Sequence, residues 1–402
     1  MASPSFSAPV AARVPRVEDF ALLFGLDSAV RGLMLSVVPL EMYRAWGEGT
    51  VVSAFFLGTG LVSLLAGLSV PSLARRLGRG RTTLAAPLLY LAGMGLYLTG
   101  NPWLVALALL VNAVGTVTAW VCISAYVLDW VPRGELGRNE SMRLLYGATS
   151  WTAGPYAGVL LLDWWRPAPF LLAAAFSAGL AAWLLRLGLG DGKAVRARSG
   201  PAARPLAYLG RFLRQPRLVA GWIFATVRSC GWWVYIVYLP LFCIQNGLGE
   251  TVGGAAVSVS SALLFATPWL LRLVHRWSVR RAVRWTFAWT TLCFLGAWAL
   301  SGAPWATVAC LMLGALGLIM LDVCGSLPFL MAVKPSQRTE MAAVYSSFRD
   351  VSGIVSPLVG GAILMVAPVA AVFGACGLGM AAAWAVAGTV HPRLGVRRSV
   401  SG

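Results

Sequence analysis

Long apolar segments recur along almost the whole 402-residue chain, and they constrain its fold more than any other feature. Each is long enough to cross about 30 Å of hydrocarbon, at about 1.5 Å per helical residue. Only 11% of the residues are charged, against roughly 25% in soluble domains. The sequence therefore predicts an all-α membrane protein with twelve transmembrane helices. They are expected at residues 19–44, 50–73, 82–100, 103–131, 142–165, 168–188, 217–245, 252–275, 281–301, 304–333, 341–366 and 368–390.

Basic residues gather in alternate gaps between these segments. The chain has 32 Lys and Arg against 14 Asp and Glu, a net charge of +18. One set of gaps holds Arg clusters and the basic stretch 189–216, whereas the opposite set holds little beyond Arg44 and Arg166. Because basic loops stay on the cytoplasmic side, both termini and the central stretch are expected there. A nucleic-acid-binding protein would instead gather basic residues on one face of a soluble domain, so no nucleic-acid partner is expected.

Residue types that carry out chemistry are sparse. All seven cysteines lie in apolar segments without a Cys-x-x-Cys spacing, and His275 and His391 are far apart in sequence. Gly188-x-x-x-Gly192-Lys193 has one residue too few for a phosphate-binding loop and lacks the following Ser or Thr. The sequence therefore predicts no metal site, no cofactor and no catalytic residue, which argues against an enzyme.

The two halves of the chain repeat at a nearly constant offset. Val30-Arg31 matches Val227-Arg228, and Gly154-Pro155-x-x-Gly158 matches Ser356-Pro357-x-x-Gly360. Matches in the same order at nearly one offset indicate two parallel copies of a six-helix unit. We therefore expect two pseudo-symmetric six-helix bundles. The predicted division is a tail at 1–18, bundles at 19–188 and 217–390, a basic linker at 189–216 and a tail at 391–402.

Two six-helix halves, a basic central loop and cytoplasmic termini together resemble the major facilitator superfamily. Leu73-Ala-Arg-Arg76-x-Gly78-Arg79 is similar to that family's cytoplasmic signature loop, which implies gating roles for Arg76, Gly78 and Arg79. The sequence departs from the signature because Pro71 stands where Gly is usual and Arg75 where Asp is usual. The carboxylate that the family uses for gating contacts is therefore missing from this loop.

Gly154-Pro155-Tyr-Ala-Gly158 resembles an element associated with proton-coupled exporters of that superfamily, although Val159 replaces its last Gly. The resemblance implies export. The alternative is geometric: small residues let two helices approach closely, and Pro kinks a helix. The related Pro357 in the second half shows that the pattern also serves geometry.

Two arginines lie deep in apolar segments, where a charge is costly and usually paired or functional. Arg31 is near the middle of the first segment, and Arg228 holds the same depth in the seventh. The family resemblance places both beside a central cavity. Asp27, one turn before Arg31, either neutralises it or releases it on protonation. Asp322 lies at a similar depth in the tenth segment and is the expected partner of Arg228.

Other polar and aromatic residues are weaker candidates. Trp232 and Tyr235 continue the Arg228 face and either pack against neighbours or stack on a planar ligand. Asn112 is expected to form a hydrogen bond across the cavity. Arg349 and Asp350 are expected to pack against the tenth segment or form a gate rather than touch substrate.

These features predict a secondary active transporter that moves a small molecule by alternating access. Protons are the expected coupling ion, carried by Asp27 or Asp322. Efflux of an amphipathic drug or metabolite by proton antiport leads. The alternative is import of a small organic anion, clamped by Arg31 and Arg228. We expect a monomer in the lipid bilayer of the plasma membrane, the inner membrane of a bacterium.

Overall fold

The computed structural model describes residues 15–131, 135–189, 209–266, 279–324 and 347–388, with Phe329, Met341, Val344 and Tyr345. The first six long helices are α1 Val17–Trp46, α2 Gly49–Leu77, α3 Arg79–Leu98, α4 Pro102–Trp130, α5 Leu136–Trp164 and α6 Ala168–Leu187. The helices that follow, of which α8 is short, are α8 Leu209–Leu213, α9 Pro216–Gln245, α10 Glu250–Ala262 with the 3-10 turn η3 Leu263–Ala266, α12 Val279–Ala299, α13 Pro304–Cys324, α16 Phe348–Leu364 and α17 Ala370–Ala387. The ends of the predicted segments at 275, 333 and 390, most of the linker, most of the first tail and all of the second tail lie outside the described residues.

The described helices are apolar enough for a membrane. Seven of them are long and hydrophobic enough to cross one: α1, α2, α4, α6, α9, α13 and α17. An all-α membrane fold is therefore what the apolar segments predicted. The total of twelve transmembrane helices stays a prediction.

Local sequence explains where several helices begin and end. Asn101 caps α4, because its side-chain oxygen accepts the backbone N–H groups of Trp103 and Leu104 at 3.0 and 3.4 Å. Pro102 and Pro216 occupy first helical positions, where the missing N–H costs nothing. At Gly78, between α2 and α3, φ is +88°, a conformation that only glycine adopts readily.

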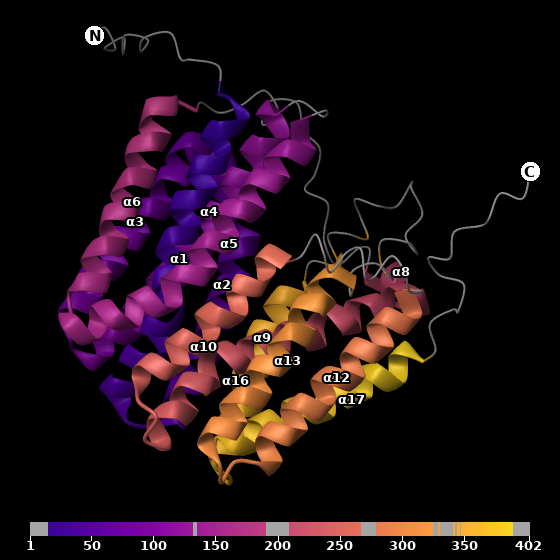
Figure 1. Ribbon diagram of the computed structural model, residues 1–402. Coiled ribbons are helices and arrows are strands. Elements are labelled where there is room, and N and C mark those ends of the chain that lie inside the picture. Colours follow the sequence, from indigo (N-terminus) through magenta and orange to yellow (C-terminus); the bar gives the residue numbers. More distant parts are fainter. Residues whose placement is uncertain are drawn as a thin grey trace, which may run out of the picture.

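The helices form two groups, α1–α6 and α8–α17, which lie side by side in Figure 1. Within the first group α1 packs against α4, α5 and α6, and within the second α12 packs against α13 and α17. Between the groups α2 packs against α16, α5 against α10, and α1 against α9. Helices α1, α2 and α5 therefore form the contact surface of the first group.

Glycines let the two groups approach backbone to backbone. A Cβ atom added at Gly60 of α2 would lie 2.6 Å from the carbonyl oxygen of Gly353 on α16. One added at Gly254 of α10 would lie 2.9 Å from Val159 on α5. Side chains larger than glycine would push these helices apart, so the two seams depend on these residues.

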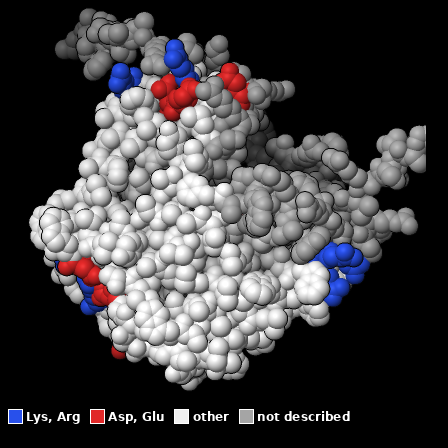
Figure 2. Space-filling view, viewed as in Figure 1, with Lys and Arg blue, Asp and Glu red and all other residues white. Residues whose placement is uncertain are grey.

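The two ends of the helices are distinguished by their turns. The Gly47 end contains the turn between α1 and α2, and the Gly78 end contains the turn between α2 and α3. In the view of Figure 2, the charged side chains of the described residues gather at the margins and leave a broad uncharged face between them. This distribution suits a protein whose middle is surrounded by lipid.

Candidate functional site

Arg31 is neutralised within its own helix. Its Nε donates to Asp27 Oδ2 at 2.9 Å, and its Nη2 lies 2.7 Å from the same oxygen. Tyr90 of α3 donates its hydroxyl to the other Asp27 oxygen at 2.9 Å and lies 3.1 Å from the Thr116 hydroxyl of α4. The side chain of Asp27 is 3% exposed and that of Arg31 19%. Both oxygens of Asp27 are therefore engaged in a network that joins α1, α3 and α4.

Arg228 is neutralised across two helices. Its Nη1 donates to Oδ1 of Asp322 on α13. Trp232, one turn after Arg228 on α9, donates its indole N–H to the other Asp322 oxygen at 3.0 Å. The side chain of Asp322 is 32% exposed, whereas that of Arg228 is 16% exposed. The structure thus brings Arg228, Trp232 and Asp322 together, with the acid more accessible than its partner.

A row of aromatic rings and guanidinium groups links these two pairs. Arg31 and Arg143 both lie over the Phe24 ring, 5.9 and 5.0 Å from its centroid. Arg31 also lies 5.7 Å from the Trp151 ring. At these distances a guanidinium group is attracted to the face of the ring.

The row continues into the second group of helices. Arg143 and Arg349 lie over the Trp120 ring at 5.1 and 5.0 Å. Arg349 and Arg228 lie over the Phe348 ring at 5.6 and 5.4 Å. We call the whole row the arginine–aromatic array. Its members are Phe24, Arg31, Trp120, Arg143, Trp151, Arg228, Phe348 and Arg349.

Arginines from the two groups of helices lie at similar distances from the Gly47 end. Arg31 is about 22 Å along α1 from Trp46, and Arg349 is about 22 Å along α16 from Leu364, at about 1.5 Å per residue. Leu364 packs against Gly49, so both distances are measured from the Gly47 end. The two groups therefore contribute charges at matching depth.

Several predicted residues lie outside this array. Tyr235 is fully buried, and its hydroxyl contacts Ser260 Oγ at 2.7 Å and the Ala256 carbonyl at 3.0 Å, both on α10. Tyr235 thus packs against α10, as one of its two interpretations expected, and a ligand contact for it stays a prediction. The side chain of Asn112 lies against Gly93 of α3 rather than among the arginines. A substrate contact for Asn112 stays a prediction.

Sequence reasoning placed Arg349 and Asp350 against the tenth segment or in a gate. In the structure Arg349 lies over Trp120 of α4, in the other group of helices, and a gating role for it stays a prediction. Asp350 is half-buried beside it. The sequence did not single out Phe24, Trp120, Arg143, Trp151 and Phe348 for this array, because contacts between distant helices leave no local pattern in the sequence.

The Gly-Pro element of α5 lies directly behind Arg31. A Cβ added at Gly154 would lie 2.3 Å from the carbonyl carbon of Gly32, and one at Gly158 would lie 2.3 Å from the Leu33 carbonyl oxygen. Pro155 lies on the side of α5 that faces Gly254 of α10. In the repeat, the buried Pro357 precedes Gly360, which packs against Tyr238 of α9. The element therefore sets close helix packing around the array.

The signature-like loop holds its own group of helices together. Arg79 forms an ion pair with Asp129 of α4 and lies 5.2 Å from the Tyr126 ring. Asp129 thus supplies a carboxylate to this region although the loop itself lacks one. Arg76 is exposed, and Gly78 makes the turn. Gating by Arg76, Gly78 and Arg79 stays a prediction.

A network of charges joins the two groups at the Gly47 end. Arg44 of α1 donates its Nε to Glu250 of α10 at 2.9 Å and lies 3.6 Å from Asp163. Nearby, Arg166 donates to the buried Glu41 at 2.6 Å. This network holds α1 against α10.

Hydrogen bonds between uncharged groups also join the two groups of helices. Ser53 of α2 and Tyr238 of α9 share a hydrogen bond of 2.9 Å. The backbone N–H of Tyr156 donates to Ser258 of α10 at 2.9 Å. The two groups are therefore tied together by polar contacts on the Gly47 side of the array.

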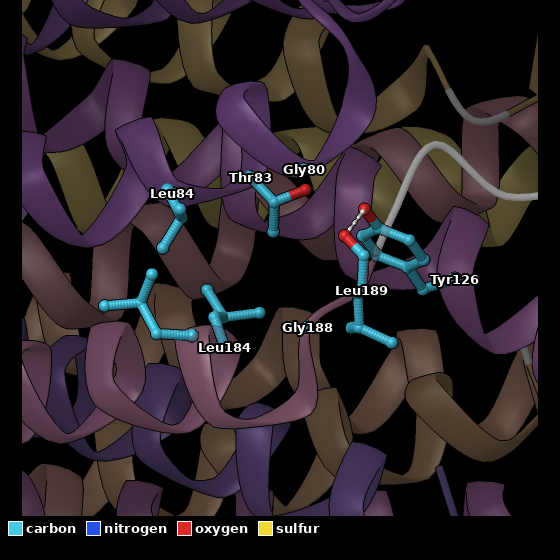
Figure 3. Close-up of a pocket in the computed structure, with 8 residues that line it drawn as sticks. Gly80, Thr83, Leu84, Tyr126, Leu184, Gly188 and Leu189 are labelled. Atoms are coloured by element: carbon cyan, nitrogen blue, oxygen red, sulfur yellow. Dashed lines mark hydrogen bonds between the residues drawn. The ribbon is translucent and has the colours of Figure 1, made fainter. Parts of the chain in front are cut away.

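A small cavity of about 100 Å³ lies elsewhere, where α3, α4 and the end of α6 meet near the Gly78 end. Figure 3 shows Thr83, Leu84, Tyr126 and Leu184 around it, and the hydroxyl of Tyr126 donating to the Leu189 carbonyl at 3.2 Å. Ligand pockets usually measure about 300–1,000 Å³. This cavity is too small for a typical substrate, and it contains no member of the array.

The chain belongs to the Major Facilitator Superfamily, whose family profile matches residues 20–357. Members of this superfamily are transporters rather than enzymes. No curated protein matches the chain in sequence.

Solved structures share the fold at low sequence identity. A point mutant of the nucleoside transporter NupG is 13% identical with a TM-score of 0.74, covering 93% of this chain and 99% of its own. NupG itself is 12% identical with a TM-score of 0.69 and covers 93% and 98%. A D-xylose–proton symporter is 12% identical with a TM-score of 0.68 and covers 94% and 97%. The chain is therefore a multi-pass membrane protein with the transporter fold of its family.

Proposed function

We propose that this protein is a proton-coupled secondary transporter that moves a small organic molecule across the plasma membrane by alternating access. The bundles 19–188 and 217–390 would rock about the array, with both termini in the cytoplasm. The arginine–aromatic array carries the proposal, because charges from both bundles meet there at matching depth. Polar contacts seal the Gly47 end, which supports a conformation open toward the Gly78 end.

Asp322 is the carboxylate that we assign to proton coupling. Its side chain is 32% exposed, so water and protons reach it, and it holds Arg228 by an ion pair between helices. Protonation would remove the negative charge that Arg228 faces and free the guanidinium group for substrate. Asp27 is 3% exposed with both oxygens bonded, which supports a neutralising role for it instead.

The direction of transport has two candidates. The Gly154-Pro155-Gly158 element resembles that of exporters and favours efflux of an amphipathic drug or metabolite by proton antiport. Its contacts with Gly32 and Leu33 also explain it as packing, which leaves room for the second candidate. Import with protons is favoured by the cationic array and by the likeness to a solved proton symporter.

Alternating access can be tested before the substrate is known. Spin labels attached to noncanonical amino acids that replace the exposed residues Trp164 and Asn246 would report the separation of the bundles at the Gly47 end. We expect the share of the separated state in lipid nanodiscs to change with pH in the natural protein and in Asp27→Asn. In Asp322→Asn it should stay constant. A pH response in Asp322→Asn equal to that of the natural protein would exclude Asp322 as the proton carrier.

Direction is tested separately once a ligand has been found. Accumulation of that ligand in cells, with and without an uncoupler, separates the candidates. An uncoupler raises the cellular content of an exported compound and lowers that of an imported one.

A further inference from the structure

Arg349 differs from the other arginines of the array. Arg31 and Arg228 each form an ion pair with an aspartate. Arg349 forms no ion pair or hydrogen bond through its side chain with any of the residues that the structure describes, and it is exposed. The adjacent Asp350 is half-buried and forms no ion pair with it. Arg349 is therefore an exposed cation without an ion-pair partner among the described residues, at the same distance from the Gly47 end as Arg31.

The surroundings of Arg349 add to this positive charge. Arg143 lies over the same Trp120 ring, 5.1 Å from its centroid, so a second guanidinium group lies close to Arg349. Collecting like charges at this depth is costly unless an anion offsets them. The field at this place therefore favours a negative ligand over a neutral or positive one.

The groups around Arg349 also suit a particular ligand shape. A guanidinium group presents a planar fork of N–H donors that matches a carboxylate or phosphate with two parallel hydrogen bonds. Trp120 and Phe348 both lie next to that fork, at 5.0 and 5.6 Å. Flat aromatic surfaces next to an anion-binding fork accommodate a planar apolar group attached to the anion.

We propose that Arg349 and Trp120 form the anion subsite of the transport site, and that the substrate is a small organic anion with an aromatic or similarly planar body. This inference rests on the proposed function, since it takes the array as the site around which the bundles move. It also moves the expected anion contact from Arg31 and Arg228, which are already paired, to Arg349.

Proton binding and anion binding should then favour each other. Arg228 lies over the same Phe348 ring that contacts Arg349. When Asp322 takes up a proton, Arg228 becomes a second unpaired cation beside the subsite. Because linkage is reciprocal, bound anion must in turn raise the proton affinity of the site. This coupling favours movement of proton and anion together.

The test uses a panel of small probes with the purified full-length protein, read by thermal shift and isothermal calorimetry. Naphthoate, cinnamate and phenylphosphonate combine an aromatic ring with an anion. Acetate has the anion alone, naphthamide the ring alone, and naphthylmethylamine a ring with a cation. We expect stabilisation by at least one member of the first set and by none of the other three.

Variants locate the binding. Arg349→Gln should lower the affinity of the bound aromatic anion roughly 10-fold or more, because a charge-assisted contact is lost. Arg349→Lys keeps the charge without the fork and should give an intermediate loss. Trp120→Leu should weaken aromatic anions by about 10-fold as well. The matched control is Arg186→Gln, an exposed arginine that lies 5.2 Å from the Trp183 ring on α6, outside the array. It should bind like the natural protein.

Two results would overturn the inference: no binding by any aromatic anion, or binding that is unchanged in folded Arg349→Gln. Should Arg349→Gln fail to fold, the aromatic-anion affinities of Arg349→Lys and Trp120→Leu test the inference. Unchanged affinity in both variants would contradict the subsite. The spin-label experiment with Trp164 and Asn246 remains independent of this outcome. A pH-dependent opening without aromatic-anion binding would leave the proposed transporter intact and remove only its substrate class.

Discussion

The two repeat-related arginines are neutralised in different ways. Arg31 finds its acid one turn away on the same helix, in a network with Tyr90 that leaves Asp27 3% exposed. Arg228 finds its acid on another helix, and Asp322 is 32% exposed. The two positions that match between the halves of the sequence therefore both hold a cation, while the counterion differs. One pair suits a fixed structural role, and the other suits a charge that can be removed by a proton.

The largest expected effect comes from breaking the Asp27–Arg31 ion pair in the first bundle. Asp27→Asn leaves Arg31 without its counterion in a nearly closed environment, so we expect a loss of about 3–5 kcal/mol in the free energy of unfolding. Reversible unfolding in detergent measures it. The double variant Asp27→Asn/Arg31→Met removes both charges and should recover most of the loss. Equal stability of Asp27→Asn and the natural protein would show that the network does not stabilise the bundle.

A smaller effect concerns the helix packing behind each arginine. Gly154→Ala places a methyl group against the backbone of Gly32, which cannot rotate away, so we expect a loss of about 1–3 kcal/mol. Gly360→Ala in the second bundle meets a side chain, the hydroxyl end of Tyr238, rather than backbone, and should cost less. Gly95→Ala, with open space around it on α3, is the control and should be neutral or stabilising. Equal losses for Gly154→Ala and Gly360→Ala would contradict the difference between the bundles.

The pair in the second bundle should contribute less to stability than the first. Asp322→Asn should lower the free energy of unfolding by about 1 kcal/mol, because the carboxylate is partly solvated and the amide can still accept the Trp232 N–H. A double-mutant cycle with Arg228→Met gives the interaction energy for comparison with Asp27 and Arg31. If the Arg228–Asp322 interaction energy were as large as that of Arg31 and Asp27, the two pairs would not differ in their contribution to stability.

The smallest expected effect concerns an ion pair that joins the bundles. Glu250→Gln removes one partner of Arg44 and should shift the conformational equilibrium by about 0.5 kcal/mol, or about 2-fold, toward separation at the Gly47 end. The label distance between Trp164 and Asn246 measures this shift. Glu48→Gln, an exposed acid at the same end, is the control for a general change in charge. A decrease in the separated population would contradict the seal.

Much of the fold follows from the sequence, because each apolar segment carries its own evidence of length and boundaries. The depth of Arg31 and the position of Asp27 also follow, since both belong to one helix. Contacts between helices do not follow in the same way. Trp120 meets Arg143 and Arg349 only because α4 faces two other helices, and Tyr235 turns to α10 although its spacing from Arg228 suggested a shared face. Asp129 reaches Arg79 from a helix distant in sequence.

The glycine seams between the bundles have a consequence for the conditions that govern opening. At Gly60–Gly353 and Gly254–Val159 the helices approach through glycine, which has no side chain of its own to interlock with the partner helix. Resistance to separation at the Gly47 end then comes from the hydrogen bonds of Ser53 and Tyr156 and from the ions around Arg44, which is 36% exposed. Attraction between exposed ions weakens as dissolved salt rises, with a screening length of about 8 Å at physiological ionic strength. The salt concentration of the medium at the Gly47 end should therefore regulate how often the two bundles separate there.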